Sequence, residues 1–304
     1  MQVPFGKRWA NLGHVRALVA GCGYIGLAVA KELIRLGHEV SGMRRTPAAS
    51  VELEQAGIRP LIVDITRADD LKRLPPSFDW VVNCTSSSGG DVDEYRSVYI
   101  EGNRNLVGWL TGSPVRKFVY TSSTSVYGQV DGAPVDETSP TEPDAETAKV
   151  LLDAEEVLLT AAMQRGQGPV FPAVVLRVAG IYGPGRGYWF KQFVTGQARI
   201  EGKGERVSNM VHRDDVAGAV VCALERGVPG RIYNVVDNRP VTQLELFQSL
   251  ASRSGKPLPP FVTAEEGPGL RKRGLTNKRV SNARLRQELG YELRYPTFEE
   301  GIEL

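Results

Sequence analysis

Short apolar runs alternate with stretches of helical spacing along most of the chain. The first run, Val15 to Ala20, is typical of a buried strand, and the segment from Tyr24 to Leu36 carries apolar residues at helical spacing. Gly37 can supply the left-handed residue that ends this helix. The alternation continues as far as Arg177. Strands separated by helices predict right-handed crossovers and a parallel sheet.

The pattern predicts further strands at 39–43, 60–63, 80–84, 117–121 and 173–177, and helices at 51–56, 95–110 and 147–165. Beyond residue 177 it is less regular. We expect a Gly/Pro-rich loop at 183–187, an Asp-capped helix at 214–226, and a capping box of Thr242 and Glu245 that opens another helix.

These elements predict an α/β fold, a doubly wound Rossmann sheet with a smaller C-terminal substrate-binding subdomain. Residues 1–14 are expected to form a leader, and 15–177 the Rossmann domain, to which 206–236 return. Residues 178–205 and 237–304 are expected to form the smaller subdomain.

Composition narrows the class of protein. A chain of 304 residues, 41% hydrophobic and 24% charged, can bury the core of an ordinary globular enzyme. The formal charge of +2 comes without a basic stripe, so we expect no nucleic-acid partner. No segment has the length or apolarity of a membrane span or secretory signal. The three separated cysteines favour reduced thiols in a cytoplasm and lack the paired spacing of a metal site.

A glycine-rich motif lies between the first strand and the first helix. Gly21 would permit a tight turn, Gly23 would let the backbone approach a pyrophosphate, and Gly26 would let helix and sheet pack closely. The phosphates would sit on free N–H groups at the start of the helix, next to Tyr24 and Ile25. In this context the motif predicts a dinucleotide site; a merely glycine-rich turn is the weaker interpretation.

Two arginines follow the second strand, where an NAD-binding chain usually carries an acidic residue. Arg44 and Arg45 could grip the 2′-phosphate of NADP through paired hydrogen bonds, although two solvated arginines would look the same. We therefore expect NADP, with NAD as the alternative. After the third strand, Asp64 could accept a hydrogen bond from an adenine amine with Ile65 against the ring, or Asp64 could cap a helix.

With these residues assembled, the chain resembles the extended short-chain dehydrogenase/reductases, also called the NAD-dependent epimerase/dehydratase family, as an atypical member. The resemblance runs from Val15 almost to Leu304. The landmarks that carry it are Gly-Cys-Gly-Tyr-Ile-Gly at 21–26, Val-Asp-Ile at 63–65, Thr-Ser-Ser-Thr-Ser-Val-Tyr-Gly at 121–128, Leu-Arg at 176–177, Ile-Tyr-Gly-Pro-Gly-Arg at 181–186, Val-His-Arg-Asp-Asp-Val-Ala at 211–217, Ile-Tyr-Asn-Val at 232–235 and Leu-Gly-Tyr at 289–291.

The resemblance assigns roles to several residues. Ser123 would hydrogen-bond a substrate oxygen, although a turn or N-cap serine is the simpler interpretation of that residue alone. Lys149 would be catalytic and hold the nicotinamide ribose, and Thr85 would also touch the cofactor. Tyr182 and Arg186 would lie on the substrate side.

Tyr188 is a candidate wall of the substrate pocket. The basic cluster at 271–273, Lys278 and Arg279 could meet a substrate diphosphate, with a solvated face as the simpler interpretation. His212 is expected to organise its loop, with Asp214 and Asp215 capping the next helix.

The chain departs from the family at the catalytic tyrosine. The family's Tyr-x-x-x-Lys pattern, set on Lys149, places Ala145 at the tyrosine position, and Tyr99 stands where the family has a helix asparagine. Loss of a general acid–base group typically costs about 10²- to 10⁴-fold in rate.

Two functions therefore stay open. One is an NAD(P)-dependent oxidoreductase or epimerase/dehydratase-like enzyme acting on a hydroxyl or carbonyl, with a nucleotide sugar as one candidate substrate. The other is an NADP-binding sensor without turnover. We expect a small molecule as the binding partner and no association with a membrane. Homodimer formation is left open.

Overall fold

The computed structural model describes residues 13–89, 91–163, 170–263 and 276–302. Its centre is a parallel sheet of seven strands in the order β12-β7-β5-β4-β1-β2-β3. The bounds are Ile232–Val235 for β12, Ala173–Val178 for β7, Lys117–Ser123 for β5, Trp80–Asn83 for β4, Arg16–Ala20 for β1, Glu39–Arg44 for β2 and Arg59–Ile62 for β3. The predicted doubly wound sheet is confirmed.

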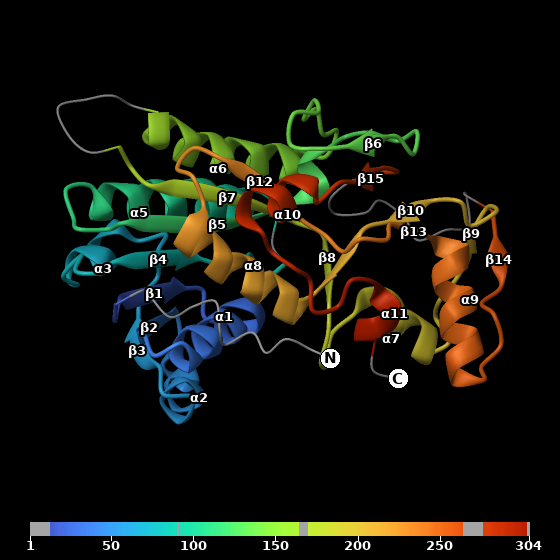
Figure 1. Cartoon of the computed structure of the whole chain (residues 1–304), viewed down its shortest axis with the longest axis horizontal. Coiled ribbons are helices and arrows are strands. Elements are labelled where there is room, and N and C mark those ends of the chain that lie inside the picture. The colour runs from blue at the N-terminus through green and yellow to red at the C-terminus, as the bar shows by residue number, and fades with distance from the viewer. Residues whose placement is uncertain (1–12, 90, 164–169, 264–275, 303–304) are drawn as a thin grey trace.

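Helices cover both faces of this sheet. Figure 1 shows α5 (Gly102–Leu110) and α6 (Glu146–Met163) on one face, and α1 (Tyr24–Arg35) and α8 (Arg213–Arg226) on the other. Strands buried on both sides are continuously apolar, as in Val81–Val82 of β4 and Val174–Leu176 of β7. The remaining helices are α2 (Ser50–Gln55), α3 (Ala68–Lys72), α4 (Val92–Tyr95), α7 (Tyr188–Val194), α9 (Gln243–Ser254), α10 (Ala283–Leu289) and α11 (Phe298–Gly301).

The strand order reverses between β1 and β4. Strands β1, β2 and β3 run outward on one side, and β4, β5, β7 and β12 run outward on the other. In open parallel sheets, the loops at the carboxyl ends of the strands part at such a reversal and leave a crevice there for a ligand.

A second apolar cluster lies apart from the sheet. It contains Phe193 of α7, Phe247 and Leu250 of α9, and Phe298 of α11. Short strand pairs border it: β8 (Gly180–Tyr182) with β11 (Met210–His212), β9 (Ile200–Glu201) with β14 (Phe261–Val262), and β10 (Val207–Ser208) with β13 (Val241–Thr242). A further pair joins β6 (Pro134–Val135) to β15 (Arg279–Val280).

Two predicted elements differ from the structure. The helix expected at 95–110 is divided into α4, a π-helical segment Arg96–Glu101, and α5. Helix α8 is capped by His212, whose Nδ1 accepts the N–H of Asp214, so the expected aspartate cap is wrong. Asp215 instead accepts the Tyr291 hydroxyl and the backbone N–H of Arg294 and Tyr295. The Thr242–Glu245 capping box is confirmed.

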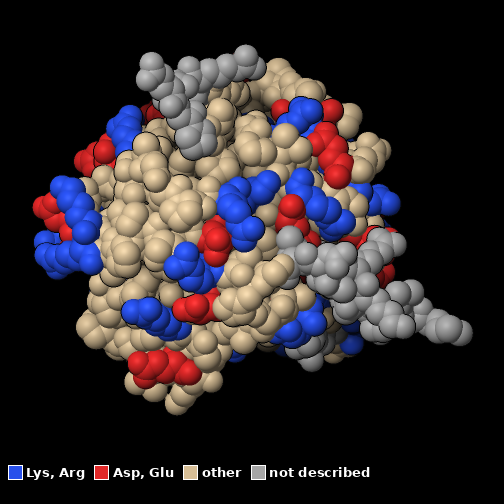
Figure 2. Space-filling model, turned by 60° about the vertical axis from the view of Figure 1, so that its left-hand side comes forward, with Lys and Arg blue, Asp and Glu red and all other residues tan. Residues whose placement is uncertain are grey.

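Charges of both signs are interspersed on the face that Figure 2 shows. Among the described helices, none is long and apolar enough to cross a membrane.

Candidate active site

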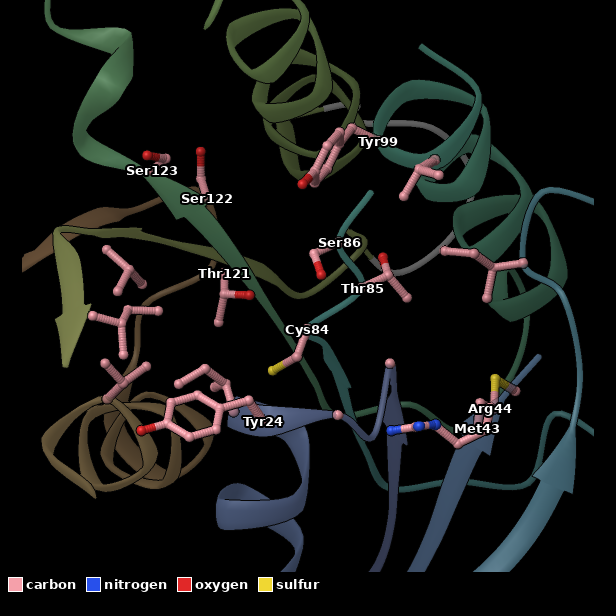
Figure 3. A pocket seen from close by; sticks show the side chains of 18 of the residues that line it. Tyr24, Met43, Arg44, Cys84, Thr85, Ser86, Tyr99, Thr121, Ser122 and Ser123 are labelled. Atoms are coloured by element: carbon pink, nitrogen blue, oxygen red, sulfur yellow. The ribbon is translucent and has the colours of Figure 1, made fainter. Parts of the chain in front are cut away.

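A cavity of about 480 Å³ opens at the reversal of strand order, above the carboxyl ends of the strands (Figure 3). Its walls come from the loops after β1 to β4, the end of β5, the π-helical segment and α6. Nine residues predicted to bind the cofactor line it: Gly21, Gly23, Tyr24, Ile25, Arg44, Arg45, Asp64, Ile65 and Thr85.

The glycine loop has the geometry that each glycine was expected to provide. Gly21 has φ +75°, and a Cβ there would lie 2.5 Å from the backbone nitrogen of Thr85, so only glycine fits. A Cβ on Gly26 would lie 2.4 Å from the carbonyl oxygen of Gly21, which explains the close contact of helix and loop. A Cβ on Gly23 would meet only the Arg44 guanidinium, at 3.5 Å. The space over Gly23 therefore belongs to the cavity.

Helix α1 begins directly at this open space. No side chain caps its N-terminus at Gly23, and its first turn contains no acidic residue. The free N–H groups and the positive end of the helix dipole together favour a phosphate.

Arg44 and Asp64 lie at the β2–β3 end of the cavity. Arg44 Nη1 donates to the carbonyl oxygen of Cys22 at 2.8 Å, which ties its guanidinium to the glycine loop, and Arg45 is exposed on the cavity rim. Asp64 Oδ1 accepts the backbone N–H and hydroxyl of Thr66, at 3.0 and 2.8 Å. Helix α3 begins later, so Asp64 closes a turn and caps no helix.

Thr85 and Tyr24 lie nearer the middle. Thr85 donates through its N–H and its hydroxyl to Asn83 Oδ1, at 3.0 and 2.7 Å. The Tyr24 hydroxyl donates to the carbonyl oxygen of Pro184 at 3.2 Å, and the guanidinium of Arg186 lies 5.0 Å from the centre of the Tyr24 ring. Burial raises the pKa of Tyr24. Tyr24 therefore connects the glycine loop to the loop at 183–187.

Ser123 ends β5 and lines both this cavity and a second one. Its Oγ accepts the N–H of Ser125 at 3.2 Å, so the serine also caps the short 3₁₀ helix at 124–126. The preceding residue, Ser122, is also held in place. Its hydroxyl donates to Glu155 at 2.5 Å, and Glu155 forms a buried ion pair with Arg177 at 2.7 Å. The end of β5 is thus held rigidly.

The family resemblance implies that Lys149 lies beside the cofactor, but in the structure Lys149 lines neither cavity. Its ammonium pairs with Glu146 at 2.7 Å, and about half of its side chain is exposed. Leu151 lines the first cavity instead, and Thr147 is buried one turn before it. Two residues along a helix are about 200° apart, so Lys149 and Leu151 point to nearly opposite sides.

The second cavity, of about 390 Å³, continues from the first. It shares Ser123, Ala179, Gly180, Ile181 and Arg186 with it. Tyr182 and Tyr188, both predicted on the substrate side, line it with Arg186. Tyr182 is buried, and its hydroxyl donates to the carbonyl oxygen of Thr297 at 3.3 Å.

Of the further residues of this second cavity, Lys278 was named from the sequence in the basic cluster, but Trp189, Phe190 and Arg206 were not named as site residues. Trp189 and Phe190 add aromatic surface, and Arg206 and Lys278 add two cations to Arg186. Burial lowers the pKa of Lys278 to about 8, and its ammonium donates to the carbonyl oxygen of Tyr127. The adjacent basic residues at 271–273 lie outside the described residues, and Arg279 binds the carbonyl oxygen of Gly132 instead. The aromatic run at 188–190 was visible in the sequence, whereas nothing in the sequence pointed to Arg206.

Within the described ranges, no group of three or more His, Cys, Asp or Glu side chains is placed to hold a metal ion. Tyr127, in the motif at 121–128, is buried and donates its hydroxyl hydrogen to Asn234 Oδ1 at 2.9 Å.

Comparison with known proteins places this architecture in a family. The model of the "NAD dependent epimerase/dehydratase family" matches residues 17–235. Protein YeeZ of Escherichia coli (strain K12) is 28% identical over 92% of this chain and 96% of its own length. A 2-alkyl-3-oxoalkanoate reductase of Shewanella oneidensis is 26% identical over 82% of this chain and 68% of its own.

A solved structure of a conserved protein of unknown function from Silicibacter pomeroyi is also similar. It is 30% identical, with a TM-score of 0.74 over 94% of this chain and 96% of that one. Because the family model matches most of the chain, this protein belongs to the NAD-dependent epimerase/dehydratase family.

Proposed function

We propose that this chain is an NAD(P)-dependent oxidoreductase that moves a hydride between the nicotinamide ring and a hydroxyl or carbonyl group of a small anionic substrate. One observation carries the proposal: the cavity above the glycine loop and the aromatic, cationic cavity share a wall formed by Ser123, residues 179–181 and Arg186. A cofactor in the first cavity and a substrate in the second would meet at that wall.

We expect a dinucleotide to extend along the first cavity. A pyrophosphate would lie over Gly23 on the N–H groups of α1, because a side chain there would fill the space. The adenosine half would lie toward Arg44, Asp64 and Ile65. The nicotinamide half would lie toward Ser123 and the shared wall.

The two arginines at the end of β2, Arg44 and Arg45, support NADP over NAD. Arg44 uses one N–H for Cys22, and its guanidinium has further donors for a 2′-phosphate. Arg45 adds a second cation at the rim, and the nearest carboxylate lining this cavity, Asp64, is engaged with Thr66. A phosphate there would find charge-assisted hydrogen bonds.

The second cavity supports a substrate with a planar or apolar part and a negative charge. Trp189 and Phe190 offer the apolar surface, while Arg186, Arg206 and Lys278 offer positive charge. A nucleotide sugar meets this description, as do other anionic carbonyl compounds. Ser123 would donate its hydroxyl hydrogen to the reacting oxygen. When bound, the nicotinamide would accept or give the hydride.

Calorimetric titration of NADP⁺ and NAD⁺ tests the cofactor part. We expect NADP⁺ to bind more tightly, and Arg44→Asp to weaken NADP⁺ by about tenfold or more because a carboxylate repels the 2′-phosphate. Arg67→Asp is the matched control, since Arg67 is exposed and lines neither cavity. Equal affinities in the wild type, or an unchanged Arg44→Asp variant, would contradict the NADP assignment.

A coupled assay of NADPH absorbance tests the oxidoreductase part. Carbonyl compounds with and without a phosphate or carboxylate would be compared, and we expect turnover only with the anionic ones. Tight NADP⁺ binding together with silence across a broad metabolite panel would instead favour a cofactor-binding sensor.

A further inference from the structure

Tyr99 stands in the π-helical segment Arg96–Glu101, the only π-helical segment in the described part of the chain. Such segments change the direction of one side chain relative to a regular helix and frequently lie at functional sites. Tyr99 is 4% exposed and lines the first cavity. Figure 3 shows its hydroxyl end pointing into the cavity, on the side of Ser122 and Ser86 and away from Arg44.

The Tyr99 hydroxyl has a defined hydrogen-bonding role. It accepts the backbone N–H of Ser87 at 3.2 Å, and its ring packs against Tyr95 with 5.1 Å between centroids. Among the described residues, no acceptor receives the hydroxyl hydrogen of Tyr99. A hydroxyl that accepts one bond and keeps its hydrogen can donate that hydrogen to a ligand oxygen.

The neighbouring helix, α6, presents no phenol to this cavity. Helix α6 packs against the π-helical segment and presents Leu151 to the cavity, while Lys149 faces away. The other phenol that lines this cavity, Tyr24, already donates to Pro184. Burial raises the pKa of Cys84 to about 12, so Cys84 is a neutral thiol, whose S–H group is only a weak donor. Tyr99 is left as the phenolic donor at this end.

We propose that Tyr99 is the residue that holds the nicotinamide half of the cofactor, by donating its hydroxyl hydrogen to an oxygen of that half. The inference rests on the proposed function, because it requires a dinucleotide in the first cavity. The adenosine half would be fixed at the β2–β3 end and the pyrophosphate over Gly23, so the part beside Tyr99 and Ser122 is the nicotinamide side. Position and polarity together make Tyr99 a cofactor-contacting residue.

The experiment compares whole and half cofactors. Calorimetry would measure NADP⁺ and NAD⁺, each against its adenosine half (adenosine 2′,5′-bisphosphate and AMP), with wild type, Tyr99→Phe and Tyr95→Phe. Both variants keep a buried ring and remove one phenolic oxygen, but Tyr95 lines neither cavity.

We expect Tyr99→Phe to weaken the whole dinucleotide about five- to tenfold, as for loss of one hydrogen bond, and to leave the half cofactor unchanged. Tyr95→Phe should change neither. The inference is overturned if Tyr99→Phe binds both ligands like the wild type, or loses both equally, which would mark a structural role. A wild type that binds neither whole dinucleotide would contradict the proposed function itself.

Discussion

At the scale of single residues, Asp237 is a buried acid whose negative charge the fold disfavours. It follows β12, is 2% exposed, and accepts the N–H of Arg239 through Oδ1 at 3.0 Å. Its Oδ2 is buried and has no partner among the described residues. Burial, together with the nearby Glu299 and Asp215 carboxylates, raises its pKa to about 7.

This raised pKa predicts a pH-dependent stability. An unfolded aspartate titrates near 4, so between about pH 4 and 7 the folded state binds more protons than the unfolded state. The free energy of unfolding should therefore fall as pH rises through this range. Asp237→Asn should remove the effect and be more stable than wild type at pH 8 by about 2 to 4 kcal/mol, but not at pH 4.

Urea unfolding at both pH values measures this difference. The exposed Asp93 provides the control, because Asp93→Asn should change stability little at either pH. If Asp237→Asn gave the same stability difference at pH 4 and pH 8, the buried charge would not be the cause.

At the scale of elements, helix α6 shows where prediction from the sequence ends. Six strands of the central sheet, β1 to β5 and β7, and the helices α1, α2, α6 and α8 are predicted to within a few residues, because apolar periodicity reports burial directly. Strand β12 and the short strand pairs are not predicted from this pattern. The spacing of the family motif predicted that Lys149 of α6 faces the cavity, whereas Leu151 lines it. The buried face of α6 includes Ala148, Leu151, Ala154, Glu155 and Leu158, and Lys149 is not part of it.

The contacts that fix α6 to the sheet could not be predicted from the sequence. Glu155 is fixed by Arg177 and Ser122, which are distant along the chain. The π-helical turn that directs Tyr99 inward was missed for a related reason: its backbone hydrogen-bond pattern leaves no mark on the apolar periodicity.

The orientation of α6 predicts opposite outcomes for two substitutions. Lys149→Met should change dinucleotide affinity less than about twofold, because its exposed pair with Glu146 contributes little. Leu151→Trp should reduce affinity by roughly tenfold or more by filling cavity space. Calorimetry would measure both, with thermal melts to check folding. A tenfold loss in Lys149→Met would show that the lysine reaches the cofactor after all.

At the scale of the whole molecule, the site depends on where the chain returns to the sheet. After β7 the chain forms β8, α7, β9 and β10, and it returns through β11 and α8 to β12, which pairs with β7. It then leaves the sheet again for β13, α9 and β14. The second cavity is therefore built from segments between residues 123 and 302. Local sequence patterns predict the Rossmann sheet and its glycine loop, but not which of these distant residues, such as Arg206 and Lys278, meet in one wall.

The claim that a dinucleotide sits over the glycine loop is tested most directly by titrating NADP⁺ and NAD⁺ into Gly23→Val. A side chain at Gly23 has room in the protein but occupies the space assigned to the pyrophosphate. The matched control is Gly108→Val, at an exposed position with nothing near its Cβ. We predict an unchanged melting temperature without ligand and an affinity reduced roughly a hundredfold or more in Gly23→Val alone, about 3 kcal/mol. Wild-type affinity in Gly23→Val would contradict the account.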